Sequence, residues 1–439
     1  MDDFTIAADN NAPTQDISVN TAKPDLTASQ ELAKGQQVDQ KSIYGEVPQI
    51  PTLDAIEGIK FDFNDGIRIL FPQNQKEYHV TFSDIDTGII LFSQDTVPGA
   101  YVTSVKKFYI RFRLVIHEKG GREPIFTHDF DAKDKEVMIQ LPVGTIGDSI
   151  GWFSYVERFQ KKHQCKVICV MAPWIAEIVK KQYPEIIFIA PEETKNYKPY
   201  ACYYLGLFFR GNTTNQPSDF RYVGLHRTAG YILGVDPEEV PPKFDLSAPR
   251  QIKEPYVCIA VQSSNQAKYW NNPYGWREVV SYLKSQGYRV LCVDRMTEYG
   301  CDYTWNHIPY GAEDFTGDLP LQERIDIIKD ADFFIGLSSG LSWLAWCCRV
   351  PVVLISGFTD PINEFYTPYR VRNRTVCHGC WNDTRIEFDH FNFLWCPRRE
   401  KASDKFECTK SITGKMVIDQ IKRIERSANG ANQRNTCSQ

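Results

Sequence analysis

Four cysteines toward the end of the chain have a spacing that could hold a metal ion. They form the pattern Cys377-x2-Cys380-x15-Cys396-x11-Cys408, which begins in the polar stretch CHGCW. Two close cysteines can fix half of a tetrahedral site, two later ones can close it across a loop, and four thiolates suit zinc or iron. His378 and His390 are spare candidate ligands, but four sulfurs are sufficient. We therefore expect a structural metal with no open coordination position; the alternative is four unrelated buried thiols.

An aspartate lies at the junction between an expected strand and an expected helix. In the segment IQLPVGTIGDSIGWFSYVERF, Gly144 and Gly147 permit tight turns and Asp148 stands where the helix begins. The helix dipole favours a carboxylate there, so one interpretation is a helix N-cap. The other is a carboxylate held in a cleft as a general base. Position alone favours the cap, because caps are common and catalytic bases are rare.

Two later loops carry groups that suit an anionic ligand. Ser263 and Ser264 directly follow the apolar run YVCIAV, and Lys268 comes shortly after them. Hydroxyls and an ammonium at the end of a strand are suited to a phosphate. In the later segment SSGLSW, Gly340 permits close approach of a ligand to the backbone, and the amides at the start of the next helix suit a diphosphate. Either loop alone could instead be an ordinary solvated turn.

The elements that position these residues alternate between strands and helices. Short apolar runs alternate with amphipathic segments after Val137, and they do so again from YVCIAVQSS to VPVVLISG. Such alternation predicts parallel sheets covered on both faces by helices. We expect an α/β protein with two Rossmann-like lobes, at residues 134–236 and 254–428, joined by a Pro-rich linker at 237–253. Ligands of open parallel sheets bind at the carboxyl ends of strands, where the residues above lie.

The remaining segments are expected to have no catalytic role. Apolar residues alternate with polar ones from Ile59 to about Asp131, which predicts an antiparallel β-rich domain at 55–133 that serves as a scaffold or an oligomer contact. Residues 1–54 and 429–439 are polar and predict disordered tails. The segment KMVIDQIKRIER is amphipathic and basic, so it could pack back onto the first lobe or face a membrane.

Composition narrows the class of protein. The 439 residues are 42% apolar and 24% charged with a net charge of -5, which is typical of a globular protein of two or three domains and argues against a general nucleic-acid binder. The acidic start has no signal-peptide pattern, and no apolar run is long enough to cross a bilayer. We therefore expect a cytoplasmic protein whose cysteines stay reduced.

The three loops, in this order, resemble those of the ADP-heptose:heptosyltransferase superfamily. The matching motifs are the Gly147-Asp148 pair, the two-hydroxyl loop followed by Lys268-Tyr269-Trp270, and the diphosphate loop SGLSW. The resemblance implies a GT-B arrangement of the two lobes and an inverting reaction with Asp148 as the base. The chain departs from the lipopolysaccharide enzymes at Trp343, where they usually carry His, which puts their lipid-sugar acceptor in doubt. The residues expected to contact the donor are Gly147, Ser149, Ile150, Ser263, Ser264, Lys268, Ser339, Gly340, Leu341 and Ser342.

Three further residues follow the next strand of the second lobe. Cys292, Asp294 and Met296 could line an adenosine pocket, or they could be ordinary loop positions.

The cysteine pattern on this core, behind a β-rich N-terminal part, is similar to that of the bacterial autotransporter heptosyltransferases from about Ile59 to Ser427. The resemblance implies transfer of heptose from ADP-heptose to serines of an autotransporter adhesin in the cytosol before export. It also implies a ferric ion, with zinc as the alternative, and a homododecamer. The alternative functions are a lipopolysaccharide core heptosyltransferase and a non-catalytic scaffold whose metal finger binds nucleic acid.

Overall fold

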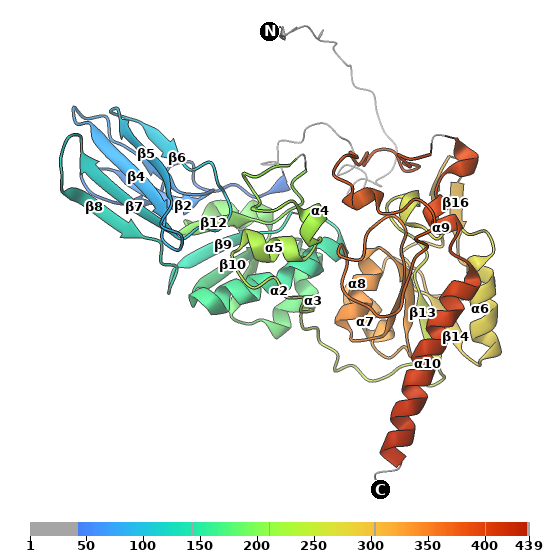
Figure 1. Ribbon diagram of the computed structural model, residues 1–439. Helices are drawn as coiled ribbons and strands as arrows, with labels where there is room; N and C mark the ends of the chain where they lie inside the picture. Colours follow the sequence, from blue (N-terminus) through green and yellow to red (C-terminus); the bar gives the residue numbers. More distant parts are fainter. Residues whose placement is uncertain (1–42, 143, 210, 303, 400, 437–439) are drawn as a thin grey trace, which may run out of the picture.

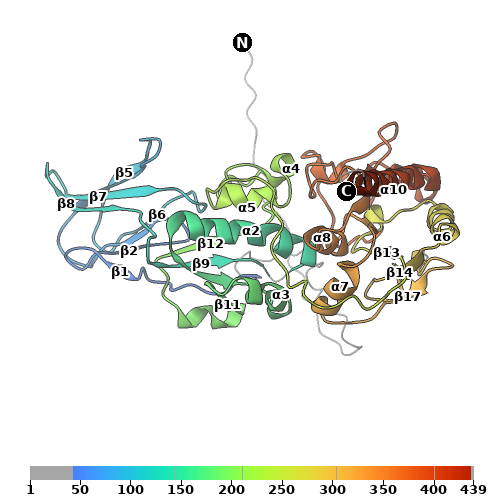
Figure 2. The ribbon, with the colours of Figure 1, turned by 90° about the horizontal axis from the view of Figure 1, so that it is seen from below.

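Each of the two blocks of alternating apolar and amphipathic segments folds into an α/β lobe, and the two lobes lie next to each other along the molecule (Figure 1). The computed structural model describes residues 43–142, 144–209, 211–302, 304–399 and 401–436. A smaller antiparallel sheet extends from the side of the first lobe that faces away from the second (Figure 2). The predicted α/β class with two lobes and a β-rich N-terminal part is confirmed. None of the helices in the described residues is long and apolar enough to cross a membrane.

The first lobe is built on an eight-stranded sheet in the order β11-β10-β9-β12-β2-β3-β6, with β1 also paired to β2. The strands from β11 to β2 run parallel, whereas β3 and β6 continue the sheet antiparallel. The strands are β1 (Leu53–Asp54), β2 (Lys60–Asn64), β3 (Arg68–Leu70), β6 (Tyr101–Thr103), β9 (Glu136–Gln140), β10 (Lys166–Val170), β11 (Ile186–Ile189) and β12 (Ala201–Tyr204). The helical segments are α2 (Ile146–His163), α3 (Pro173–Val179), η3 (Lys180–Gln182), η4 (Pro191–Asn196), α4 (Phe220–Val223) and α5 (Arg227–Ile232).

The β-rich segment at 55–133 is divided between two sheets, one of which belongs to the first lobe, and the expected domain boundary at residue 133 stays a prediction. Strand β2 is inserted into the sheet of the first lobe, where Phe63 lies opposite Ala201 of β12. Buried residues on β2 complete the core of that lobe, and this burial outweighs separation into a domain. The other strands, β4 (Tyr78–Asp84), β5 (Ile90–Thr96), β7 (Phe112–Glu118) and β8 (Pro124–Asp129), form a separate antiparallel sheet.

The expected N-terminal tail is also shorter than 54 residues. Residues 1–42 lie outside the described part, but the segment from 43 onward is held against the first lobe. The Tyr44 hydroxyl donates to the Leu205 carbonyl at 2.7 Å, and the Gly45 amide donates to Gln140 Oε1 at 2.8 Å. These contacts join positions far apart in the sequence, so the composition of the segment could not reveal them.

The second lobe contains a six-stranded parallel sheet in the order β17-β14-β13-β18-β19-β20. Its central strands are short and buried on both faces, as parallel sheets require. The strands are β13 (Tyr256–Ile259), β14 (Arg289–Cys292), β17 (Glu313–Asp314), β18 (Phe334–Leu337), β19 (Val352–Ile355) and β20 (Arg370–Val371), and a hairpin is formed by β15 (Glu298–Cys301) and β16 (Thr304–His307). The helical segments are η5 (Gln266–Lys268), α6 (Gly275–Ser285), α7 (Leu321–Ile328), α8 (Gly340–Cys347), η6 (Cys380–Asn382), η7 (Ala402–Asp404), α9 (Glu407–Lys410) and α10 (Gly414–Thr436).

The long C-terminal helix α10 packs on the second lobe, not on the first as expected (Figure 1). Val417, Ile421 and Ile424 lie in the core beside α6 and β19, so the apolar face is already covered. The helix also continues to Thr436, past residue 429 where a tail was expected, while residues 437–439 lie outside the described part. The predicted linker 237–253 contains neither helix nor strand.

Candidate active site

The first turns of helices α2 and α8 meet between the lobes at two glycines. A Cβ atom at Gly340 would lie 2.8 Å from the Ile146 Cβ, and one at Gly147 would lie 2.9 Å from Trp343 Cδ1. Neither position can accept a side chain without a shift of its neighbours. The first amides of a helix have no partner within the helix and carry partial positive charge, so two such ends brought together favour an anion.

We predict that Gly340→Ala strongly reduces transfer activity. The added methyl group would press on Ile146 and on the Gly147 amide, 3.3 Å away, and would push the two helices apart next to Asp148. The measurement is kcat/KM together with the thermal unfolding midpoint. Gly144→Ala is the matched control, because the nearest atom to its Cβ would be the Pro142 oxygen at 3.5 Å. Equal activity in the two variants would contradict the tight contact.

Trp343 fills the space beside these glycines and is buried between the lobes. Its ring lies against Gly147 and Gly151 of α2, and it makes edge contacts with His226 at 5.3 Å and with Phe365 at 5.1 Å between ring centroids. The residue that departs from the lipopolysaccharide enzymes is therefore part of the contact between the lobes.

Asp148 is not the cap of helix α2, because the N-cap position is occupied by Thr145. Asp148 lies in the first turn and is half-buried. Burial raises the pKa of Asp148 above its ordinary value, while a hydrogen bond from Thr145 and the positive charge of Lys268 act in the opposite direction. A carboxylate with a raised pKa accepts a proton more readily than an exposed one, as a general base requires.

Lys268 approaches the same place from the second lobe, at the end of η5. Its Nζ lies 3.5 Å from the Ser264 hydroxyl. Burial lowers the pKa of Lys268, and the negative charges of Asp148 and Glu364 oppose that shift. The structure thus brings the predicted base and the predicted ammonium together from opposite lobes. Ser263 and Ser264 lie in the loop between β13 and η5, and Ser264 is exposed.

The loop before α8 contains a hydroxyl without a partner. Ser339 is the N-cap of α8, and its buried Oγ has no hydrogen-bond partner within the described residues. Together with the amides of Gly340 and Leu341, it can bind a phosphate oxygen. Ser342 differs from the expectation, because its side chain is buried and donates to the Leu337 carbonyl at 2.6 Å. The Ser342 hydroxyl therefore stabilises the backbone of the loop between β18 and α8.

Two other predicted donor contacts are core residues. The side chains of Ser149 and Ile150 are buried in the first lobe, and their contact with the donor stays a prediction. An amphipathic helix turns one face toward its sheet, and the motif did not show that this face begins immediately after Asp148. Gly147 remains at the cleft through its backbone.

The three residues predicted to line an adenosine pocket differ in burial, and their contact with a ligand stays a prediction. Cys292 is fully buried at the end of β14. Asp294 is also buried and accepts the amides of Val261 and Gln262 at 2.7 and 3.2 Å, and burial raises its pKa to about 6. The Asp294 carboxylate therefore links the loop after β14 to the loop after β13 through hydrogen bonds. Met296 is 40% exposed and can contact a ligand.

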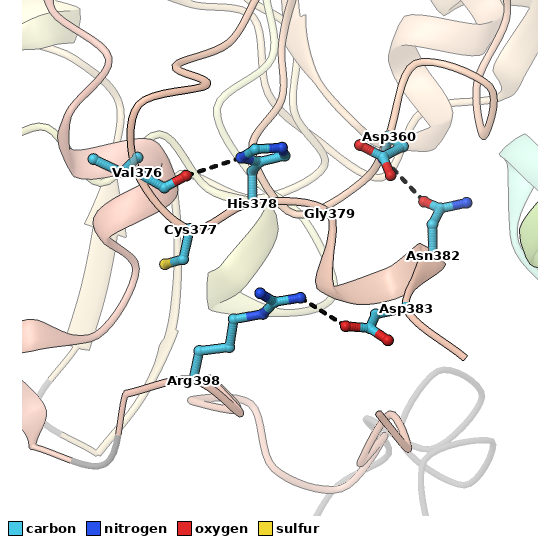
Figure 3. A pocket seen from close by; sticks show the side chains of 8 residues that line it. All are labelled: Asp360, Val376, Cys377, His378, Gly379, Asn382, Asp383 and Arg398. Atoms are coloured by element: carbon cyan, nitrogen blue, oxygen red, sulfur yellow. Dashed lines mark hydrogen bonds and ion pairs between the residues drawn. The ribbon is translucent and has the colours of Figure 1, made fainter. Parts of the chain in front are cut away.

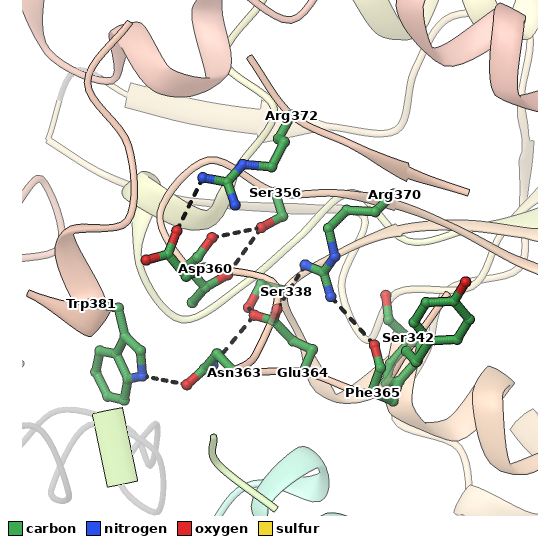
Figure 4. A network of polar contacts seen from close by, with 12 residues as sticks. Ser338, Ser342, Ser356, Asp360, Asn363, Glu364, Phe365, Arg370, Arg372 and Trp381 are labelled. Carbon is green, nitrogen blue, oxygen red and sulfur yellow. Dashed lines mark hydrogen bonds and ion pairs between the residues drawn. The ribbon is translucent and has the colours of Figure 1, made fainter. Parts of the chain in front are cut away.

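Sequence reasoning missed Glu364, which lies at the centre of a buried polar network (Figure 4). Its carboxylate accepts the Ser338 hydroxyl and the guanidinium of Arg370, the latter at 2.8 Å. Ser338 immediately precedes the N-cap of α8. An acidic residue in the turn after the buried strand VVLI was the available signal, since ligand sites lie at such strand ends.

The four predicted metal ligands lie near one another in the finger, the segment 377–408. Burial and charge repulsion from Cys377, Cys380 and Cys396 raise the pKa of Cys408 to about 12. All four are free thiols, and the Phe406 amide lies 3.5 Å from Cys396 Sγ, as donors around a bound thiolate do. In the described part of the chain, however, no three His, Cys, Asp or Glu side chains are already placed to hold a metal ion. The donor set fits a sulfur-ligated ion, and the sulfurs would need to converge further on binding.

A polar pocket of about 390 Å³ lies beside Cys377 (Figure 3). Its wall includes the ion pair between Arg398 and Asp383, at 2.7 Å, and the carboxylate of Asp360. A largely aromatic cluster joins the finger to both lobes. The cluster consists of Phe220, Ala267, Phe358, Cys380, Trp381, Leu394, Trp395 and Phe406.

Comparison with known proteins decides the family. Residues 56–120 match the family described as glycosyltransferase TibC, N-terminal domain, and residues 225–389 match glycosyltransferase family 9 (heptosyltransferase). The autotransporter heptosyltransferase BAHTCr of Citrobacter rodentium is 54% identical over 87% of this chain and 92% of its own length. The chain belongs to the autotransporter heptosyltransferase family. The resemblance inferred from the motifs is confirmed.

Solved structures of the family agree in fold. TibC from enterotoxigenic E. coli H10407, described as an iron-containing dodecameric glycosyltransferase, is 53% identical with a TM-score of 0.84, covering 87% of this chain and 100% of that chain. A second structure of this heptosyltransferase, in complex with ADP-D-beta-D-heptose, has the same identity and TM-score and covers 87% of this chain and 99% of that chain. One family member, BimC of Burkholderia thailandensis, is described as inactive; it is 41% identical over 87% of this chain and 88% of its length. The family therefore includes a member described as inactive as well as members described as heptosyltransferases.

Proposed function

We propose that this chain is an active autotransporter heptosyltransferase that transfers heptose from ADP-heptose to serine hydroxyls of an autotransporter adhesin in the cytoplasm, before export. The proposal that the chain is active rests on the placement of Asp148 and Lys268. They approach the same cleft from opposite lobes, so that the charge of each acts on the pKa of the other. The donor is supported by the ADP-heptose complex of TibC, and the acceptor class by the description of the family.

The proposed reaction is a single inverting displacement. The acceptor hydroxyl oxygen bonds to the anomeric carbon of heptose as the bond from that carbon to the ADP oxygen breaks. Asp148 takes the hydroxyl proton, and ADP departs with the bonding electrons. Lys268, the Ser339 hydroxyl and the first amides of α8 stabilise the negative charge that grows on the leaving phosphate. Asp148 stands on the first lobe and the phosphate site on the second, so the anomeric carbon would lie between them.

We propose that the finger binds iron through Cys377, Cys380, Cys396 and Cys408, with zinc as the alternative on donor chemistry alone. The iron of TibC supports this assignment, as does the grouping of the four thiols. Four sulfur ligands leave no open position, so the ion would supply structure and not catalysis. Assembly into a dodecamer is likewise proposed from TibC.

Intact-mass measurement of an adhesin fragment after incubation with the enzyme and ADP-heptose tests the function. We expect mass increases of whole heptose residues, which vanish when the donor is omitted. An unchanged fragment, with an active family member as the positive control, would show that this chain is inactive, as BimC is described.

Replacing Lys268 with Ala should weaken donor binding without unfolding the protein. The ammonium is desolvated and faces the proposed phosphate site, and a charge-assisted contact of this kind contributes roughly ten- to a hundredfold in affinity. Calorimetric titration with ADP measures the effect. Lys284→Ala, at an exposed position on α6, is the control. ADP affinity equal to that of the parent protein would remove Lys268 from the site.

A further inference from the structure

Asn363 lies where the finger and the two lobes meet, and it is 4% exposed. Its side-chain oxygen accepts the indole N–H of Trp381 at 2.8 Å, and its side-chain nitrogen donates to Glu364 Oε1 at 3.4 Å (Figure 4). Its backbone carbonyl accepts the Leu225 amide of the first lobe at 3.2 Å. One buried residue therefore has hydrogen bonds in three directions.

The hydrogen bond to Glu364 connects Asn363 with the donor-phosphate loop, which is the segment SSGLSW before and at the start of α8. Glu364 is 2% exposed and holds the Ser338 hydroxyl, and Ser338 is followed at once by Ser339, the N-cap of α8. Arg370 binds the other carboxylate oxygen at 2.8 Å, so the Glu364 carboxylate is fixed on both sides. A change at Asn363 would be transmitted to the loop through this rigid carboxylate.

The second direction leads to the helix that carries the base. The Leu225 carbonyl accepts the indole N–H of Trp152 at 2.7 Å, and Trp152 lies one turn beyond Asp148 on α2. The neighbouring backbones are also in close contact, because a Cβ atom at Gly224, whose φ is +98°, would clash with the Ile362 carbonyl oxygen. This region of the first lobe thus fits the Asn363 segment closely.

The third direction leads to the finger. Trp381 directly follows Cys380, and its ring contacts Phe388 at 5.1 Å and Phe358 at 5.7 Å between centroids. The next residue, Asn382, accepts the Asp360 amide and donates to the Arg221 carbonyl, both at 2.9 Å. Because Trp381 is part of the finger and packs among its aromatic side chains, a shift of the finger would move the Trp381 indole.

We propose that Asn363 is a positioning residue that holds the base-bearing helix α2 and the donor-phosphate loop in one relative arrangement, and that Trp381 makes this arrangement depend on the finger. The inference rests on the proposed function, since it assigns ADP to that loop. Its consequence is that the finger influences donor binding without touching the donor.

Trp381→Phe and Asn363→Ala test the inference in the full-length protein. Phenylalanine keeps the aromatic packing but removes the indole N–H, so we expect ADP affinity and kcat/KM to fall about five- to tenfold, which is the effect of one buried hydrogen bond. Metal content per chain should equal that of the parent. Trp395→Phe is the matched control: it is the same substitution in the same aromatic cluster, and within the described residues its indole N–H donates to no other side chain or carbonyl.

Calorimetry with ADP, elemental analysis and steady-state kinetics together decide the outcome. Parent affinity and turnover in both variants would overturn the inference while leaving the proposed function intact. Loss of ADP affinity only in proportion to loss of metal would also overturn it, because Trp381 would then act by retaining the ion. If the parent itself neither bound ADP nor transferred heptose, the proposed function would fail first.

Discussion

Asp148→Asn and Asp148→Ala should fold like the parent and lose heptosyl transfer by about a hundredfold to ten-thousandfold. Asparagine retains the shape and much of the hydrogen bonding of the first turn of α2, but it cannot take the proton of the acceptor hydroxyl. Circular dichroism and thermal unfolding test the fold, and transfer to an adhesin fragment at saturating ADP-heptose tests the chemistry. ADP binding should persist in both variants, because neither substitution changes Lys268, the Ser339 hydroxyl or the first amides of α8, which are the proposed phosphate contacts.

The pH profile gives this prediction a second check. Asp148 must be ionised to act, so turnover falls as the pH drops through its pKa, and burial places that pKa above the usual range of an aspartate. Removal of the nearby positive charge in Lys268→Ala should move the acidic limb to higher pH, because Lys268 lowers the pKa of Asp148. Near-parental turnover in Asp148→Asn would show that the carboxylate only stabilises the helix.

Changing any one of Cys377, Cys380, Cys396 or Cys408 to Ser should release the metal and strongly destabilise the second lobe. The unfolded chain has no preformed site, so the free energy of metal binding contributes directly to folding. The finger also supplies part of the aromatic cluster between the lobes, so its loss should reduce transfer through structure. Elemental analysis and thermal unfolding of parent and variants provide the measurement.

Cys301→Ser is the control for this series. Cys301 lies outside the finger, on the partly exposed hairpin strand β15. A buried cysteine such as Cys347 in α8 would be a poorer control, because its replacement by Ser would place a hydroxyl in the core. Cys301→Ser should leave metal content and stability unchanged. A metal-free parent that was fully folded and active would refute the metal site, and a zinc-loaded parent would change only the identity of the ion.

The sequence predicted those parts of the site that depend on strand ends. Asp148, Lys268 and Ser339 each follow a buried strand, and the carboxyl ends of parallel strands converge in this fold. Ser149, Ile150 and Ser342 are predicted from the motifs that contain these residues, and Cys292 from its place at the next strand of the second lobe. Their burial is decided by which face of a helix or strand meets the core, and tertiary packing sets that face.

Long-range pairing set the other limit on prediction. The segment around β2 alternates apolar and polar residues, which predicts a strand but not its partner. Glu364 and Asn363 were missed because their partners, Ser338, Trp381 and Leu225, are brought together by three separate segments of the chain. Hydrogen bonds of this kind leave no periodic pattern.

The insertion of β2 between β12 and β3 has a consequence for how the chain folds during synthesis. Strand β2 leaves the ribosome early, but its parallel partner β12 follows only after β9, β10 and β11. Until then Phe61 and Phe63 have no complete core to enter, and contacts between segments so distant in sequence form slowly. The nascent chain should therefore bind chaperones through this strand, and fragments that begin after residue 133 should aggregate when expressed alone.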